Sequence, residues 1–146
     1  MLSTKQLQNN NFQIGYLGES IALEYLKSKG FIILACNLSW RKLEIDILAK
    51  TLPATSQEHI LVCIEVKTRI HTVHNKSTQI PTYTAYSFQK HRALKTIIRQ
   101  IIKQYKWTGP IRFDLITVDL KLTNVSQSEQ PQIASKDITH YKHVMY

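Results

Sequence analysis

The chain has 146 residues, which suits one domain, because a globular chain of about 150 residues buries roughly 70% of its unfolded surface. Lysine and arginine number 19 against 10 acidic residues, and the resulting net charge of +9 favours polyanionic partners such as nucleic acid, although it could serve solubility alone. No apolar run has the length of a membrane helix, and no secretory signal opens the chain. We therefore expect a cytoplasmic protein without a membrane segment.

The first predicted elements are a helix and a buried strand. Apolar side chains recur at helical spacing over residues 13–26, after a polar stretch, residues 1–12, that is expected to form a tail. Residues 31–36 are almost continuously apolar, which is typical of a buried strand. Two cysteines lie in apolar strand-like runs and are expected to be reduced and buried, rather than disulfide-bonded or metal-bound: Cys36 and Cys63.

Two further strands carry ionisable side chains on one face each. Over residues 43–49 apolar and acidic residues alternate, which places Asp46 on the face opposite the apolar side chains. Over residues 60–67 the same alternation places Glu65 and Lys67 side by side. A polar loop between the two strands permits an antiparallel hairpin. The hairpin would bring the ionisable faces together.

The second half of the chain contains one more helix and two more strands. Residues 70–84 are polar and are predicted to form a surface loop. A strongly periodic helix is predicted over residues 86–105, a strand over 112–120, a loop over the polar residues 121–137, and a last short strand over 138–144. This order predicts an α/β fold, a single domain spanning the chain in which helices flank a mixed central β-sheet.

The combination of Asp46 with Glu65 and Lys67 is the strongest chemical signal. Two carboxylates in one pocket can hold Mg²⁺ or Mn²⁺ through oxygen ligands. Such a metal lowers the pKa of bound water and neutralises phosphate charge, as phosphodiester hydrolysis requires. Lys67 could orient the nucleophile or stabilise the transition state. A Glu-x-Lys sequence alone is weak, because a surface salt bridge has the same spacing; the preceding Asp46 strengthens it.

A wider set of short motifs runs from Gly15 to the C-terminus: Gly18-Glu19, Asn37, Glu44-Ile45-Asp46, Glu65-Val66-Lys67-Thr68-Arg69, Lys90 with Leu94, Arg112-Phe113-Asp114, Ile138 and His140. This set resembles the YraN family of uncharacterised proteins, which is related to Holliday junction resolvases of the PD-(D/E)XK superfamily. The resemblance implies a restriction-endonuclease-like core and a metal-dependent endonuclease acting on DNA, including branched or damaged DNA. Resolvase-like members often work as dimers, so a homodimer is a further expectation.

The resemblance also implies individual roles. Asp46 and Glu65 correspond to metal ligands, Lys67 to a catalytic lysine, and Glu19 to a third acidic residue that completes the cluster. The residues alone leave Glu19 open, because it lies at the edge of the apolar stripe of its helix and most glutamates in such positions are solvated.

Three basic residues are candidates for binding nucleic acid. Arg69 follows the Glu-x-Lys motif directly. Lys90 lies one helical turn before Leu94, so it could reach a phosphate from the apolar face or extend past the helix end into solvent. Arg92 begins a basic ridge on the same helix, for which an ordinary solvated face is the simpler explanation. The ridge consists of Arg92, Lys95, Arg99, Lys103 and Lys106.

Two other functions stay open. The chain could keep the fold and the basic surface as a nucleic-acid-binding module with little or no catalysis, and metal-dependent turnover would distinguish it from a nuclease. It could also be a protein-interaction adaptor, whose positive charge would then lie away from the pocket of Asp46 and Glu65. The residues do not decide between DNA and RNA.

Overall fold

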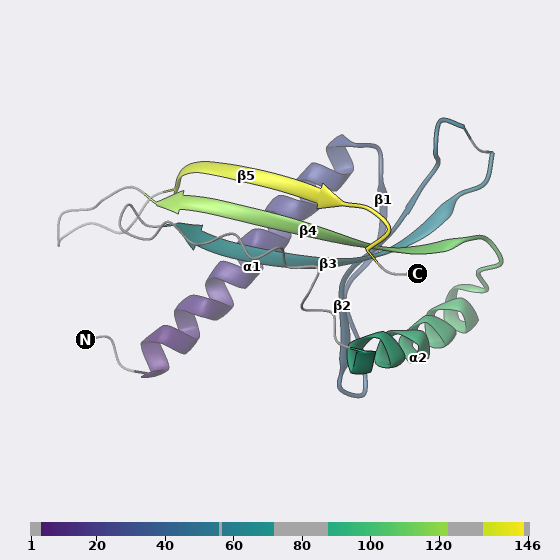
Figure 1. Ribbon diagram of the computed structural model, residues 1–146, viewed down its shortest axis with the longest axis horizontal. Coiled ribbons are helices and arrows are strands. Elements are labelled where there is room, and N and C mark those ends of the chain that lie inside the picture. Colours follow the sequence, from purple (N-terminus) through teal and green to yellow (C-terminus); the bar gives the residue numbers. More distant parts are fainter. Residues whose placement is uncertain (1–3, 56, 72–87, 123–132, 145–146) are drawn as a thin grey trace.

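The computed structural model describes residues 4–55, 57–71, 88–122 and 133–144, and their arrangement is drawn in Figure 1. Neither helix in these residues is long and apolar enough to span a bilayer. The elements follow one another as α1 (Thr4–Ser28), β1 (Ile32–Trp40), β2 (Leu43–Thr51), β3 (Ile60–His71), α2 (Phe88–Tyr105), β4 (Ile111–Leu122) and β5 (Ile133–Tyr141).

The five strands form one mixed sheet in the order β1-β2-β3-β4-β5. Neighbouring strands are antiparallel except β3 and β4, which are parallel, and the segment that connects these two contains α2. A parallel pair requires such a crossover, because the chain must return to the end of the sheet where it began. The predicted α/β fold, with a mixed sheet and an antiparallel β2–β3 hairpin, is confirmed.

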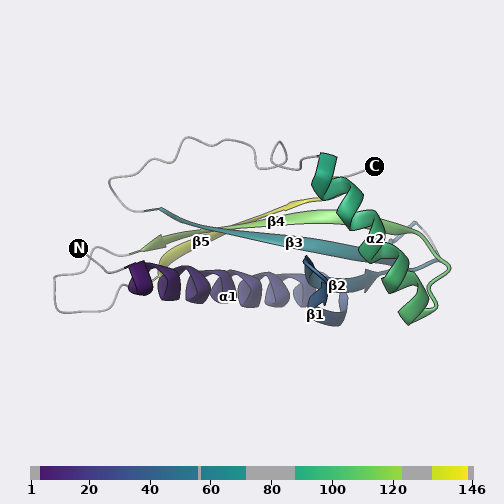
Figure 2. The same cartoon turned by 90° about the horizontal axis from the view of Figure 1, so that it is seen from below.

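Each helix covers a different face of the sheet. Figure 2 shows α1 running along one face, while α2 lies across the other near β2. Side chains of α1, including Ala22 and Leu26, pack against Val62 and Ile64 of β3. On the opposite face, Leu94, Ile97 and Ile101 of α2 pack against β2 and β3. Residues 61–64 of β3 are therefore buried on both faces, which explains their continuous hydrophobic run.

Two element boundaries near the N-terminus differ from the prediction. Helix α1 begins at Thr4, so residues 4–12 are helical and do not form a tail. No Gly or Pro interrupts this stretch before Gly15, and a helix formed further along can extend through such residues at little cost. Strand β1 continues to Trp40 instead of ending before Asn37, whose φ of 51° is one that asparagine adopts more readily than most residues.

The C-terminal strand is also longer than predicted. The expected loop over residues 121–137 is wrong at both ends, because β4 reaches Leu122 and β5 begins at Ile133; its middle lies outside the described residues. Most side chains of β5 are exposed, since β5 is an edge strand. An edge strand of this kind lacks the apolar alternation by which strands are recognised in a sequence.

The two cysteines have different environments. Cys63 lies on the central strand β3 and is buried, and this burial raises the pKa of its thiol to about 12, with a smaller contribution from the charge of Asp114. Cys36 is exposed, so its predicted burial is wrong. The reason is the position of β1 at the edge of the sheet, which leaves part of an apolar strand without a neighbour.

Candidate active site

The candidate site forms where β2 and β3 stop pairing. The last paired residues are Ile47 and Ile64, so the pairing stops one position short of Asp46 and Glu65. Beyond this point the carboxylate of Asp46 accepts a hydrogen bond from the backbone N–H of Val66 at 2.7 Å. A side-chain oxygen thus satisfies a backbone donor at the place where the ladder ends.

Glu65 and Lys67 stand on one face of β3, as the alternation of a strand requires. The ammonium Nζ of Lys67 donates to Oε1 of Glu65 at 2.5 Å. The side chain of Lys67 is 45% exposed and that of Glu65 only 16%. The lysine therefore lies at the mouth of the site and the glutamate deeper inside.

Glu19 reaches the site because α1 approaches β3 very closely at the preceding residue. Gly18 is buried, and a Cβ added to it would lie 1.7 Å from Oγ1 of Thr68 and 2.8 Å from its Cβ. Only glycine leaves room for such an approach. The close packing at Gly18 holds the neighbouring Glu19 beside the Glu-x-Lys strand.

We expect the change Gly18→Ala to destabilise the protein by about 1–3 kcal/mol, the usual cost of overpacking a filled site. The better helix propensity of alanine opposes this loss by only about 1 kcal/mol, and the short, branched side chain of Thr68 cannot move aside. Urea denaturation would measure the difference. The matched control is Gly15→Ala, because a Cβ on Gly15 meets no atom within 4 Å and should stabilise α1. Equal effects of the two changes would contradict the close approach.

The side chains of Glu19, Asp46, Glu65 and Lys67 line one pocket of about 520 Å³. Ten residues from α1, from β2 and the residue before it, and from β3 and α2 line it: Glu19, Lys42, Leu43, Glu44, Asp46, Glu65, Val66, Lys67, Ala93 and Leu94. Four predicted residues, Glu19, Asp46, Glu65 and Lys67, are thus brought together. Lys42 also lines the pocket, although no sequence motif marks it as a site residue, because only its position in the turn before β2 brings it there.

The pocket is acidic although the chain as a whole is basic. Four carboxylates and two ammonium groups belong to its described lining, against a net charge of +9 for the chain. Burial raises the pKa of Asp46 from 3.8 to about 6. This pKa is a net result: burial is its largest cause, the hydrogen bond from Val66 and the charge of Lys67 lower it, and the charges of Glu65 and Glu19 help to raise it. The negative charge of the site is therefore only partly compensated.

The predicted nucleic-acid contacts lie around this pocket. Arg69 is two residues beyond Lys67 on the same face of β3 and is half-buried. Lys90 and Arg92 lie in the first turns of α2, whose next residues Ala93 and Leu94 line the pocket; their side chains lie outside the described part of the structure. The rest of the predicted ridge, Lys95, Arg99, Lys103 and Lys106, is exposed along α2 and just after it.

Comparison with known proteins places the chain in a family. The family model described as "Uncharacterised protein family UPF0102" matches residues 18–118, which contain every residue of the candidate site. The chain belongs to the UPF0102 family. A UPF0102 protein of Dictyoglomus turgidum is 36% identical over 112 residues, covering 76% of this chain and 86% of that protein. A UPF0102 protein of Clostridium botulinum strain Hall is 34% identical over 118 residues, covering 81% and 89%.

Proposed function

We propose that this UPF0102 protein is a metal-dependent endonuclease that hydrolyses phosphodiester bonds of DNA, branched or damaged DNA included. One observation carries the proposal: carboxylates from a helix and two strands border one pocket, with Lys67 at its mouth, inside a strongly basic chain. An acidic pocket repels a phosphate backbone, so a bridging divalent cation explains why such a protein would place carboxylates there.

The donor set suits a hard cation. Mg²⁺ and Mn²⁺ prefer carboxylate oxygens, and a bound cation would stabilise the charged form of Asp46, whose pKa is raised mainly by burial and also by the charges of Glu65 and Glu19. Among the described residues, no three His, Cys, Asp or Glu side chains lie close enough to form a ready-made cluster. Mg²⁺ does not need one, since it commonly binds through one or two carboxylates and keeps several waters. Asp46 and Glu65 would hold the ion, with Glu19 as the third acidic residue.

A bound divalent cation would supply an activated water and charge neutralisation at the phosphate. The protein's own side chains would do the rest. Lys67 can exchange its bond to Glu65 for a phosphate oxygen, because its exposed side chain reaches the open side of the pocket. Arg69, Lys90 and Arg92 would contact the backbone on either side, where they position the strand without reading its sequence.

The proposed fold class rests on the same features. An Asp at the point where two strands part, a Glu-x-Lys on the next strand and a Glu from the first helix are the parts of a restriction-endonuclease-like, PD-(D/E)XK core. The mixed sheet with one helix on each face agrees with that arrangement. A homodimer remains part of the proposal, and sedimentation equilibrium would test it.

The direct test is cleavage of labelled duplex, single-stranded and four-way-junction DNA, with RNA counterparts, in Mg²⁺, Mn²⁺ or EDTA. We expect metal-dependent cutting that falls at least about 100-fold in Glu65→Gln and Lys67→Met. Glu24→Gln is the matched control, because Glu24 is an exposed glutamate of α1 that does not line the pocket. Binding of DNA without cleavage of any substrate would favour the non-catalytic binding module.

A further inference from the structure

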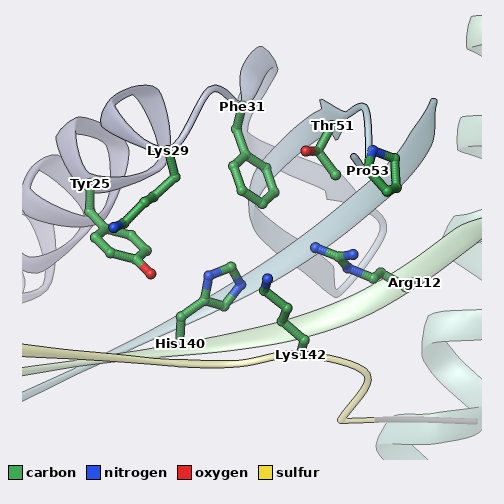
Figure 3. A pocket seen from close by; sticks show the side chains of 8 residues that line it. All are labelled: Tyr25, Lys29, Phe31, Thr51, Pro53, Arg112, His140 and Lys142. Carbon is green, nitrogen blue, oxygen red and sulfur yellow. The ribbon is translucent and has the colours of Figure 1, made fainter. Parts of the chain in front are cut away.

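A second pocket, of about 400 Å³, lies at the C-terminal end of α1. Figure 3 shows the side chains that surround it. They come from α1, β2, β4 and β5 and from residues that follow α1, β2 and β5 in the chain. Its lining includes two aromatic residues, Tyr25 and Phe31, and four basic ones, which are Lys29, Arg112, His140 and Lys142. No acidic residue is part of its described lining.

Arg112 is held rigidly at the base of this pocket. Its Nε donates to both carboxylate oxygens of Asp114, at 3.0 and 3.1 Å. Asp114 is 1% exposed, lies 2.8 Å from Nε2 of His140 and accepts a further bond from the backbone N–H of His143. Because these bonds use Nε, the terminal nitrogens of Arg112 extend toward Phe31 and Lys142 (Figure 3). A guanidinium oriented in this way is prepared to bind an anion with two parallel hydrogen bonds.

The remaining charges make the pocket strongly cationic. Lys29 and Lys142 are exposed, and their ammonium groups border it. Asp114 offsets one of the three permanent positive charges, which leaves an excess of two. The aromatic rings contribute an apolar wall, with Arg112 lying 6.0 Å from the centre of the Phe31 ring and Lys29 5.7 Å from that of Tyr25.

This pocket is distinct from the candidate active site. The two share no lining residue and carry opposite charge. Along β2, Thr51 of the second pocket is about 17 Å from Asp46 at the usual rise of a strand. Along α1, Lys29 follows Glu19 at a distance of about 15 Å, estimated from the helical rise. A ligand in one pocket therefore leaves the other open.

We propose that the second pocket binds a phosphomonoester carried by a nucleotide, either the 5′-terminal phosphate of a nucleic-acid strand or a free mononucleotide. A dianion matches the excess of two positive charges better than a singly charged internal phosphodiester. The volume exceeds that of a bare phosphate and falls in the range of pockets that hold small ligands. The aromatic wall suits the sugar or base attached to the phosphate.

The test is binding in EDTA, so that it does not depend on the proposed nuclease activity. Anisotropy would compare a 3′-labelled oligonucleotide carrying a 5′-phosphate with the same oligonucleotide carrying a 5′-hydroxyl. Thermal unfolding would compare thymidine 5′-monophosphate with thymidine. The variant combines Lys29→Gln and Lys142→Gln, exposed positions whose replacement should leave the fold intact. Its control combines Lys27→Gln and Lys136→Gln, exposed lysines of α1 and β5 outside the pocket.

We expect the wild-type protein to prefer the phosphorylated form of at least one ligand about tenfold. The pocket variant should lose the preference, and the charge-matched control and Asp46→Asn should keep it. A preference seen with the oligonucleotide alone identifies a strand end as the ligand; a shift by thymidine 5′-monophosphate identifies a free nucleotide as well. The proposal is overturned if neither ligand shows a phosphate preference, or if the preference survives in the pocket variant.

Discussion

Replacing Asp46 by asparagine is expected to remove cleavage and yet to stabilise the metal-free protein. The amide oxygen can still accept the hydrogen bond from Val66, so the local structure is kept. What disappears is the charge whose burial raises the pKa of Asp46 from 3.8 to about 6. This pKa difference corresponds to about 3 kcal/mol for a fully buried group. Solvent screening of the half-buried side chain lowers the expected gain to about 1–2 kcal/mol at pH 8.

The pH dependence of this gain has a definite sign. A carboxyl with a raised pKa in the folded state binds its proton more tightly there than in the unfolded chain. Its stabilising contribution is present below pH 3.8 and is lost as the pH rises through about 6. Asp46→Asn should therefore exceed the wild-type protein in free energy of unfolding by the largest amount above pH 6, and this difference should vanish near pH 4. Urea denaturation in EDTA would measure it.

Added Mg²⁺ should make the wild-type protein more stable than Asp46→Asn, the reverse of the order expected without metal. An ion that binds only the folded wild-type protein raises its unfolding temperature, whereas Asp46→Asn lacks a ligand and should gain little. Glu24→Gln should respond to the ion like the wild type, since Glu24 lies outside the pocket. An Asp46→Asn protein less stable than the wild type at pH 8, or one stabilised equally by Mg²⁺, would argue that Asp46 is a structural residue.

The change Asp114→Ala is expected to have the largest effect on stability, a loss of about 3–5 kcal/mol. It leaves the buried guanidinium of Arg112 without its counter-charge and removes the acceptor used by His140 and the His143 N–H. Chemical denaturation followed by circular dichroism would measure the loss. Asp137→Ala is the control, because Asp137 is exposed on β5 and should change stability by less than about 0.5 kcal/mol.

Replacing Arg112 and Asp114 together distinguishes two causes of lost stability, an unpaired buried charge and lost side-chain packing. Arg112→Met combined with Asp114→Leu removes both charges, and apolar residues in place of a buried ion pair are often neutral for stability. The double variant should thus be more stable than Asp114→Ala and fail to bind a phosphomonoester. If Asp114→Ala cost less than about 1 kcal/mol, the bonds around Asp114 would not hold the β4–β5 end of the sheet together.

Acid should weaken the same network. Burial by itself would raise the pKa of Asp114, but the hydrogen bonds from His140, Arg112 and the His143 N–H outweigh it, and the pKa lies below its ordinary value. A lowered pKa contributes stability above the ordinary range of aspartate, and this contribution is lost as the pH falls through the folded-state pKa. Asp114 and Asp46 therefore give opposite slopes of stability against pH.

The sequence alone determined the features that depend on the period of a single element. The alternation of apolar and ionisable residues in two short segments was enough to place Asp46 on one face of a strand and Glu65 beside Lys67 on the next strand. The apolar spacing over residues 86–105 predicted a helix there, and the order of elements predicted the mixed sheet. These patterns are local, because each repeats within the element that carries it.

Other features depend on which elements meet in the folded chain. Glu19 became a pocket residue through the contact of Gly18 with Thr68, and Asp46 acquired its raised pKa because the surrounding chain excludes water. The network of Asp114 joins it to His140, 26 positions away on another strand. Cys36 and most side chains of β5 are exposed because β1 and β5 lie at the edges of the sheet. Burial and proximity between distant segments are properties of the packed chain, and no local period encodes them.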